Sequence, residues 1–170
     1  MSARRIVLVG LPGSGKSTVG PLVAAELGWS FVDLDEDIVR AAGRSIPEIF
    51  AAEGESGFRA WERAATVALA DFGPLVLAPG GGWILSAANR EALGPETEVV
   101  YLAVSPEVAA TRMGGAARAR PLLAGGDPVA KLGVLLAQRE SAYLQANHMV
   151  SVDLLPPEEV AALIVALASA

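Results

Sequence analysis

The residues best suited to do chemistry form the octet GLPGSGKS at residues 10–17. Its spacing matches the phosphate-binding loop, in which four free positions separate a glycine from Gly-Lys-Ser/Thr. An apolar run at residues 6–9 precedes the octet, and a helical pattern over residues 18–27 follows it. Because strand, loop and helix occur in the order that the motif requires, we predict a site for nucleotide phosphates.

Each residue type in the octet has a physical role at such a site. The glycines let backbone N–H groups turn toward phosphate oxygens, and the N-terminus of the following helix adds a favourable dipole. Lys16 can reach the β- and γ-phosphates, and the hydroxyl of Ser17 can hold Mg²⁺. The alternative, a glycine-rich turn without a ligand, is disfavoured because motif and context agree.

Two carboxylates, Asp33 and Asp35, follow an expected short strand at residues 31–32. Ligands of open α/β sheets bind beyond the carboxyl ends of the strands. In a strand-like segment, side chains two residues apart point the same way. We therefore expect one carboxylate to support Mg²⁺ through water and the other to accept a hydroxyl proton. The alternative is that Asp35 only caps a helix over residues 36–42.

Two arginines stand in helical patterns. Arg59 and Glu62 are three residues apart and can pair. Composition alone favours a surface ion pair of little energetic value, and the alternative is an arginine that Glu62 aims at an acidic substrate. Arg139 falls inside the apolar stripe of a helix expected over residues 128–147. A buried charge there needs a partner, either a carboxylate of the protein or one of a substrate.

Two glycine-rich segments adjoin these patterns. Gly80, Gly81 and Gly82 follow an expected strand at residues 75–78 and allow close approach to a substrate, with a plain flexible loop as the alternative. Trp83 comes next, and its large side chain either shapes the pocket or packs outward. Residues 114–127 are glycine-flanked and basic, which indicates a lid over phosphates or, alternatively, a disordered linker.

The length, composition and net charge of the chain narrow the class of protein. The chain has 170 residues, of which 52% are hydrophobic, and this suits one domain with a substantial core. A net charge of −6 argues against general nucleic-acid binding. The absence of cysteine fits a reducing compartment, and we find neither a signal-peptide pattern nor an apolar run of the ~20 residues that a membrane span needs. Apolar runs alternate with helical patterns, which indicates parallel strands joined by crossover helices.

Taken together, these features resemble the shikimate kinase family of P-loop proteins. The resemblance is carried by residues 10–17, Asp33 with Asp35, residues 43–50, Gly54-Glu55, Phe58-Arg59 with Glu62, residues 80–82, Arg120-Pro121-Leu122-Leu123, and Arg139 with Tyr143. It implies a three-layer α/β/α P-loop fold with a five-stranded parallel sheet in the order 2-3-1-4-5. It also implies a single kinase domain over residues 1–170, with substrate-binding helices at about 35–62 and a lid at about 114–127.

The resemblance also implies which residues form the site. Those implied to be catalytic are Lys16, Asp35 and Arg120. Those implied to bind ATP are Gly13, Ser14, Gly15, Lys16, Ser17, Thr18, Arg112 and Arg120. Those implied to bind shikimate are Asp35, Arg59, Glu62, Gly81, Gly82 and Arg139. Mg²⁺ is expected on Ser17, with Asp33 supporting it through water.

The implied activity is transfer of the γ-phosphoryl group of ATP to the 3-hydroxyl of shikimate, a step toward chorismate and the aromatic amino acids. We expect a cytoplasmic monomer without a nucleic-acid or membrane partner. Two alternatives remain open: a kinase for a related carboxylated polyol, such as aminoshikimate or a sugar acid, and a nucleotide-binding regulatory module.

Overall fold

The sheet of this protein has five parallel strands, as predicted. The computed structural model describes residues 4–169, except for the side chains of residues 117–119. The strands are β1 (Arg5–Val9), β2 (Ser30–Asp33), β3 (Leu75–Ala78), β4 (Thr97–Ala103) and β5 (His148–Ser151). Their order is β2-β3-β1-β4-β5, and every neighbouring pair is parallel. The predicted fold class and strand order are therefore confirmed.

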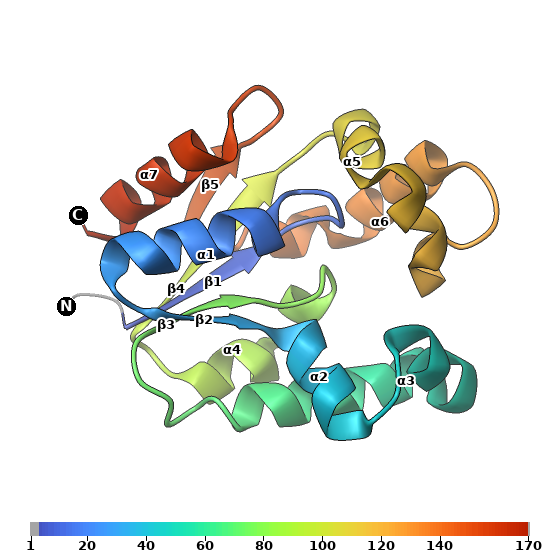
Figure 1. Ribbon diagram of the computed structural model, residues 1–170, viewed down its shortest axis with the longest axis horizontal. Helices are drawn as coiled ribbons and strands as arrows, with labels where there is room; N and C mark the ends of the chain where they lie inside the picture. The colour runs from blue at the N-terminus through green and yellow to red at the C-terminus, as the bar shows by residue number, and fades with distance from the viewer. Residues whose placement is uncertain (1–3, 170) are drawn as a thin grey trace.

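Helices cover both faces of the sheet. They are α1 (Lys16–Leu27), α2 (Leu34–Ala42), α3 (Ile46–Val67), α4 (Ala87–Leu93), α5 (Pro106–Met113), α6 (Pro128–Tyr143) and α7 (Pro157–Ala168). Short 3₁₀ turns η1 (Trp83–Leu85), η2 (Gly114–Ala119) and η3 (Pro121–Leu123) lie between them. Helices α1 and α7 pack together on the near face in Figure 1, and α6 passes behind the sheet. In the part of the chain that the structure describes, no helix is both long and apolar enough to cross a membrane.

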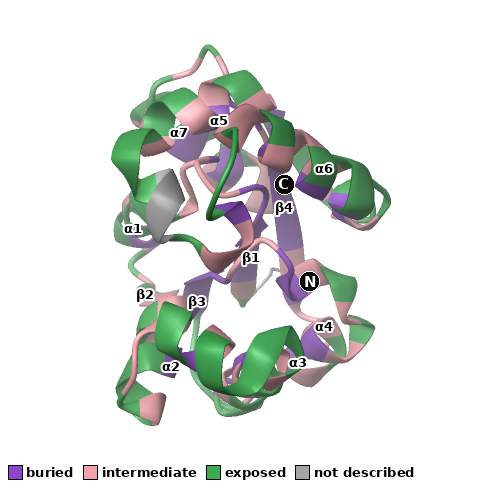
Figure 2. Ribbon diagram, turned by 90° about the vertical axis from the view of Figure 1, so that its right-hand side faces the viewer, coloured by how far each residue is buried: buried purple, intermediate pink, exposed green. Residues whose placement is uncertain are grey.

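The core lies along the central strands. Ile6, Val7 and Leu8 of β1 are fully buried, as are Leu77 of β3 and Val99 of β4. Figure 2 shows this buried centre, with exposed residues on the outer faces of α2 and α3. Strands covered on both faces are apolar throughout rather than alternating, which explains why short apolar runs marked them in the sequence.

The carboxyl ends of β1, β2 and β3 lead to the segments that the sequence singled out. After β1 comes the phosphate loop, after β2 comes α2, and after β3 comes the glycine loop, defined here as residues 79–82. Because the strands are parallel, these three segments meet at one edge of the sheet.

Helix α2 begins earlier than the sequence indicated, and this changes the geometry of the carboxylates. It starts at Leu34, and the Asp33 side chain caps it by accepting a 3.2 Å hydrogen bond from the Glu36 N–H through Oδ1. Asp35 therefore lies in the first helical turn. The expectation that Asp33 and Asp35 share one side of an extended segment is wrong, and so is the alternative that Asp35 is the cap. A short carboxylate at the N-cap satisfies an otherwise unpaired backbone donor, which favours Asp33 there.

Candidate active site

The phosphate loop has the backbone geometry that anion binding needs. Gly13 and Gly15 have φ angles of 83° and 98°, in the left-handed region that favours glycine. Gly15 is the N-cap of α1 and makes no side-chain cap hydrogen bond. The first N–H groups of α1 are thus free of a competing side chain at the end of the helix where the dipole favours an anion.

Two neighbouring cavities beside the loop share part of their lining. The larger, of about 770 Å³, is lined by most of the residues predicted to bind ATP, and we call it the phosphate compartment. The smaller, of about 370 Å³, is lined by Phe50, Phe58, Arg59 and Arg139, among others, and we call it the acidic-ligand compartment. Residues lining both are Pro12, Asp35, Gly80, Gly81, Ala116 and Arg120. Two ligands bound side by side would therefore meet at Asp35 and Arg120.

Lys16 lies at the floor of the phosphate compartment. Its ammonium group donates hydrogen bonds of 2.7 Å and 3.0 Å to the Gly10 and Leu11 carbonyls. Burial, followed by the charge of Arg120, lowers the pKa of Lys16 to about 7. The negative charge of a phosphate group would favour the protonated form again, so this lysine is suited to an anionic ligand.

Ser17 and Asp33 form an oxygen pair beside the loop. The Ser17 hydroxyl donates a 3.1 Å hydrogen bond to Asp33 Oδ2. Within residues 4–169, no cluster of three or more His, Cys, Asp or Glu side chains is positioned to hold a metal ion. Mg²⁺ usually takes one or two protein oxygens and completes its shell with phosphate oxygens and water, so this pair fits that ion together with a nucleotide.

Asp35 lies where the two compartments meet. Its Oδ1 is buried without a hydrogen-bond partner in the described part of the chain, and its Oδ2 lies 4.0 Å from Arg120 Nη1. Burial, and then the nearby charge of Asp33, raise the pKa of the Asp35 carboxyl. A carboxylate with an unused acceptor and a raised pKa is suited to orient a hydroxyl group and accept its proton.

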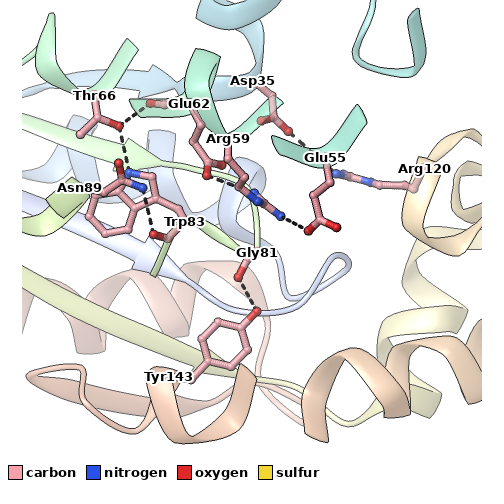
Figure 3. Close-up of polar contacts among 10 residues, drawn as sticks. All are labelled: Asp35, Glu55, Arg59, Glu62, Thr66, Gly81, Trp83, Asn89, Arg120 and Tyr143. Carbon is pink, nitrogen blue, oxygen red and sulfur yellow. Dashed lines mark hydrogen bonds and ion pairs between the residues drawn. The ribbon is translucent and has the colours of Figure 1, made fainter. Parts of the chain in front are cut away.

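Arg59 is held between two carboxylates of its own helix (Figure 3). Its Nη1 donates to Glu62 at 3.0 Å, and its Nη2 donates to Glu55 at 3.3 Å. Glu62 is 0% exposed, so the interpretation as a surface ion pair is wrong. Burial raises the pKa of Glu62 to about 7, against the opposing charge of Arg59. Composition could not show this, because burial depends on how α3 packs.

Arg139 is only 4% exposed, and it comes from α6, on the other side of the glycine loop. None of the ion pairs found among the described residues includes it. It shares the wall of the acidic-ligand compartment with Arg59. A buried guanidinium without a protein carboxylate is a strong attraction for an anionic group entering that compartment.

The glycine loop passes directly against both arginines. A Cβ atom added at Gly81 would lie 2.6 Å from Arg139 Nη1, and one added at Gly82 would overlap the Arg59 guanidinium. Tyr143 fixes the loop by donating a 2.7 Å hydrogen bond from its hydroxyl to the Gly81 carbonyl. The loop is thus a close-approach segment, and the plain flexible loop is the wrong alternative.

Two further predicted residues line the phosphate compartment from the opposite side. Arg112 donates a 2.6 Å hydrogen bond to the Val152 carbonyl, which brings it to the chain after β5. Arg120 lies between η2 and η3 in the segment predicted to be a lid. This segment forms two 3₁₀ turns, so the disordered linker is not what the structure describes. The side chain of Arg118, which contributed to the basic character of the segment, lies outside the described residues.

Sequence reasoning assigned no role to Glu55, Thr66 or Asn89. Glu55 and Arg59 are four residues apart in one helix, and this spacing could have revealed their contact. Thr66 bonds to Trp83, which is distant in the sequence, so no local signal was available.

Comparison with known proteins agrees with this geometry. The family model described as shikimate kinase matches residues 12–168. A shikimate kinase from Synechococcus sp. (strain RCC307) is 45% identical over 151 residues, which cover 89% of this chain and 77% of that protein. One from Symbiobacterium thermophilum is 46% identical over 145 residues, covering 85% and 83%.

A solved structure extends the similarity to three dimensions. The shikimate kinase from Acinetobacter baumannii, determined in complex with shikimate, superimposes with a TM-score of 0.91 at 39% identity. The match covers 97% of this chain and 92% of that one. From the extent of these matches and the phosphate loop beside a paired-arginine compartment, we conclude that this chain belongs to the shikimate kinase family.

Proposed function

We propose that this protein phosphorylates shikimate, using ATP as the phosphoryl donor and releasing shikimate 3-phosphate and ADP. The observation that carries the proposal is the junction of the two compartments. One is built for phosphates, the other presents Arg59 and Arg139 to a small anion, and Asp35 lies at their boundary. Shikimate has a carboxylate at one end and ring hydroxyls at the other, which matches this arrangement of charges.

The acceptor would be bound by its carboxylate. Arg59 and Arg139 can each offer paired N–H donors, and a planar guanidinium fork matches a carboxylate well. Phe50 and Phe58, whose ring centroids lie 5.0 Å apart, give the ring an apolar wall. The opposite end of the ligand would then reach Asp35.

In the transfer step, a ring hydroxyl oxygen forms a bond to the γ-phosphorus as the bond to the β–γ bridging oxygen breaks. Asp35 orients that hydroxyl and accepts its proton, and ADP leaves with the bridging oxygen. Lys16 and Arg120 stabilise the charge on the phosphoryl oxygens. Mg²⁺, held by Ser17 and through water by Asp33, would supply further positive charge to the phosphates.

The remaining expectations belong to the same proposal. Residues 114–127 act as a lid that brings Arg120 onto the phosphates and keeps water out of the site. The enzyme would act as a monomer with a single kinase domain, whose one five-stranded sheet carries both compartments. The net charge of −6 and the absence of cysteine support a cytoplasmic protein without a nucleic-acid partner.

The test is ADP release from Mg²⁺ and ATP with and without shikimate, with the product identified by phosphorus NMR. We expect turnover to depend on shikimate and the product to be the 3-phosphate. ATP turnover that does not respond to shikimate would contradict the proposal. Aminoshikimate and gluconate, offered separately, distinguish a kinase for a related acceptor from a regulatory module.

A further inference from the structure

Trp83 follows the glycine loop and is completely buried. The sequence had left two alternatives for its side chain, shaping the pocket or packing outward. Figure 3 shows its indole pointing toward α3. There, Nε1 donates a 3.0 Å hydrogen bond to the Thr66 hydroxyl, which itself donates a 2.8 Å bond to the Glu62 carbonyl. Asn89 of α4 donates a 3.0 Å bond to the Trp83 carbonyl. Trp83 is therefore fixed by two helices.

The opposite side of the loop is fixed in a similar way. The Tyr143 hydroxyl of α6 donates to the Gly81 carbonyl. Tyr143 lies four residues after Arg139, which lines the acidic-ligand compartment, and Thr66 lies four residues after Glu62, the ion-pair partner of Arg59. The loop thus connects the helix that carries Arg139 with the helix that carries Arg59.

The glycine loop has little freedom to shift between these helices. Gly81 and Gly82 already approach Arg139 and Arg59 so closely that a Cβ at either position would meet a guanidinium. A small displacement of the loop would therefore change the space available to the two arginines. The glycine loop also adjoins the phosphate loop, because a Cβ at Gly81 would lie 3.0 Å from the Gly10 carbonyl oxygen, but both arginines that it contacts line the acidic-ligand compartment.

We propose that Trp83 is a positioning residue, which acts through Thr66 to hold the glycine loop against α3 and so sets the spacing between Arg59 and Arg139. The inference rests on the proposed function, because that spacing determines how well a carboxylate of the acceptor fits between the arginines. Loss of the indole–hydroxyl bond weakens acceptor binding more than it weakens ATP binding.

Two substitutions remove this bond from opposite ends. Trp83→Phe keeps an aromatic ring but loses the N–H donor, and Thr66→Val keeps the shape but loses the acceptor. Thr66→Ser keeps the hydroxyl and is the matched control. We expect the KM for shikimate to rise about 5- to 10-fold in the first two, as for loss of one buried hydrogen bond. The KM for ATP should rise less than the KM for shikimate, and Thr66→Ser should keep the wild-type KM for shikimate.

A variant that carries both Trp83→Phe and Thr66→Val provides a further test. Because both substitutions remove the same bond, their effects on the KM for shikimate should not multiply. Melting curves of each variant, recorded beside the kinetics, identify any variant that does not fold, and the other single variant then supplies the kinetic result.

The possible results separate the two proposals. If the wild type depends on shikimate but the folded variants keep its KM, Trp83 has only a structural role and the inference is wrong. Equal increases in the KM values for shikimate and ATP would also overturn it. If the wild type does not respond to shikimate, the proposed function fails first and the inference fails with it.

Discussion

The two compartments of the site are built in different ways. The phosphate compartment is built around one contiguous segment, residues 10–17, and is completed by α2, the glycine loop and residues between Arg112 and Arg120. The acidic-ligand compartment takes Arg59 from α3, Arg139 from α6 and the glycine loop from the end of β3. The central loop of the phosphate compartment is a local sequence motif. The arginines of the acidic-ligand compartment come together only when distant helices pack correctly.

The compartments also differ in how their charges are balanced. Asp33 and Asp35 lie close enough to Lys16 to favour its charged form, in opposition to burial. In the acidic-ligand compartment, Arg59 has Glu62 and Glu55 as partners, but no such pair includes Arg139 among the described residues. We therefore propose that an incoming carboxylate gains most from Arg139 and that this residue is the centre of acceptor recognition.

The largest expected effect lies in the phosphate compartment. Lys16→Met removes a positive charge from the transferring phosphoryl group, and we expect kcat to fall on the order of 10³-fold. The KM for shikimate should change little, because the acidic-ligand compartment is left intact. Steady-state ADP release measures both constants.

Lys131→Met is the matched control for this prediction, because it removes the other lysine of the chain. Lys131 donates to the Ala124 carbonyl near the start of α6. A comparable loss of kcat in this variant would show that the effect of Lys16→Met reflects net charge rather than contact with phosphate.

The second-largest expected effect comes from removing an arginine of the acidic-ligand compartment. Arg139→Ala should raise the KM for shikimate roughly 10²-fold, because a charge-assisted bidentate contact is lost, and leave the KM for ATP nearly unchanged. Arg139→Lys should recover only part of the loss, since an ammonium group lacks the planar fork. Arg63→Ala, at an exposed position of α3, is the control. An Arg139→Ala enzyme with normal shikimate KM would exclude the carboxylate contact.

The smallest effect concerns Glu62 and pH. Its folded-state pKa of about 7 lies above its ordinary value of 4.5. Between these values the folded chain keeps a proton that the unfolded chain has released, so the free energy of unfolding falls as pH rises. The slope from Glu62 is on the order of 1 kcal/mol per pH unit, and Glu62→Gln should remove it.

Urea unfolding of the wild type and Glu62→Gln at several pH values from 4.5 to 7 gives this difference directly. Titrating groups distant from Glu62 contribute to both curves and cancel in the comparison. Parallel curves for the two proteins would mean that Glu62 titrates normally in the folded state.

The sequence was sufficient for most of what depends on local pattern, with the start of α2 and the contact between Glu55 and Arg59 as exceptions. The contiguous octet, buried apolar runs and helical periodicity predicted the phosphate loop and the parallel sheet, and the family resemblance supplied the strand order. The strand expected at residues 75–78 forms β3, and the helical pattern over residues 18–27 lies within α1. Such elements are predictable because the interactions that define them lie within a few residues.

The sequence did not predict the features that depend on tertiary packing. The burial of Glu62 follows from the contacts of α3 with the rest of the domain and changed the meaning of its pair with Arg59. Helix α2 started before Asp35 because Asp33 took the capping position, and this moved one carboxylate off the strand. The bond between Trp83 and Thr66 joins residues 17 positions apart, which no local periodicity connects.

We propose that Arg59 and Arg139 together recognise a carboxylate of the acceptor. The most direct test compares kcat/KM for shikimate and for its carboxamide in the wild type and in Arg139→Ala. We expect the wild type to prefer the carboxylate by on the order of 10²-fold and the variant to lose most of this preference. The same preference in both proteins would contradict it.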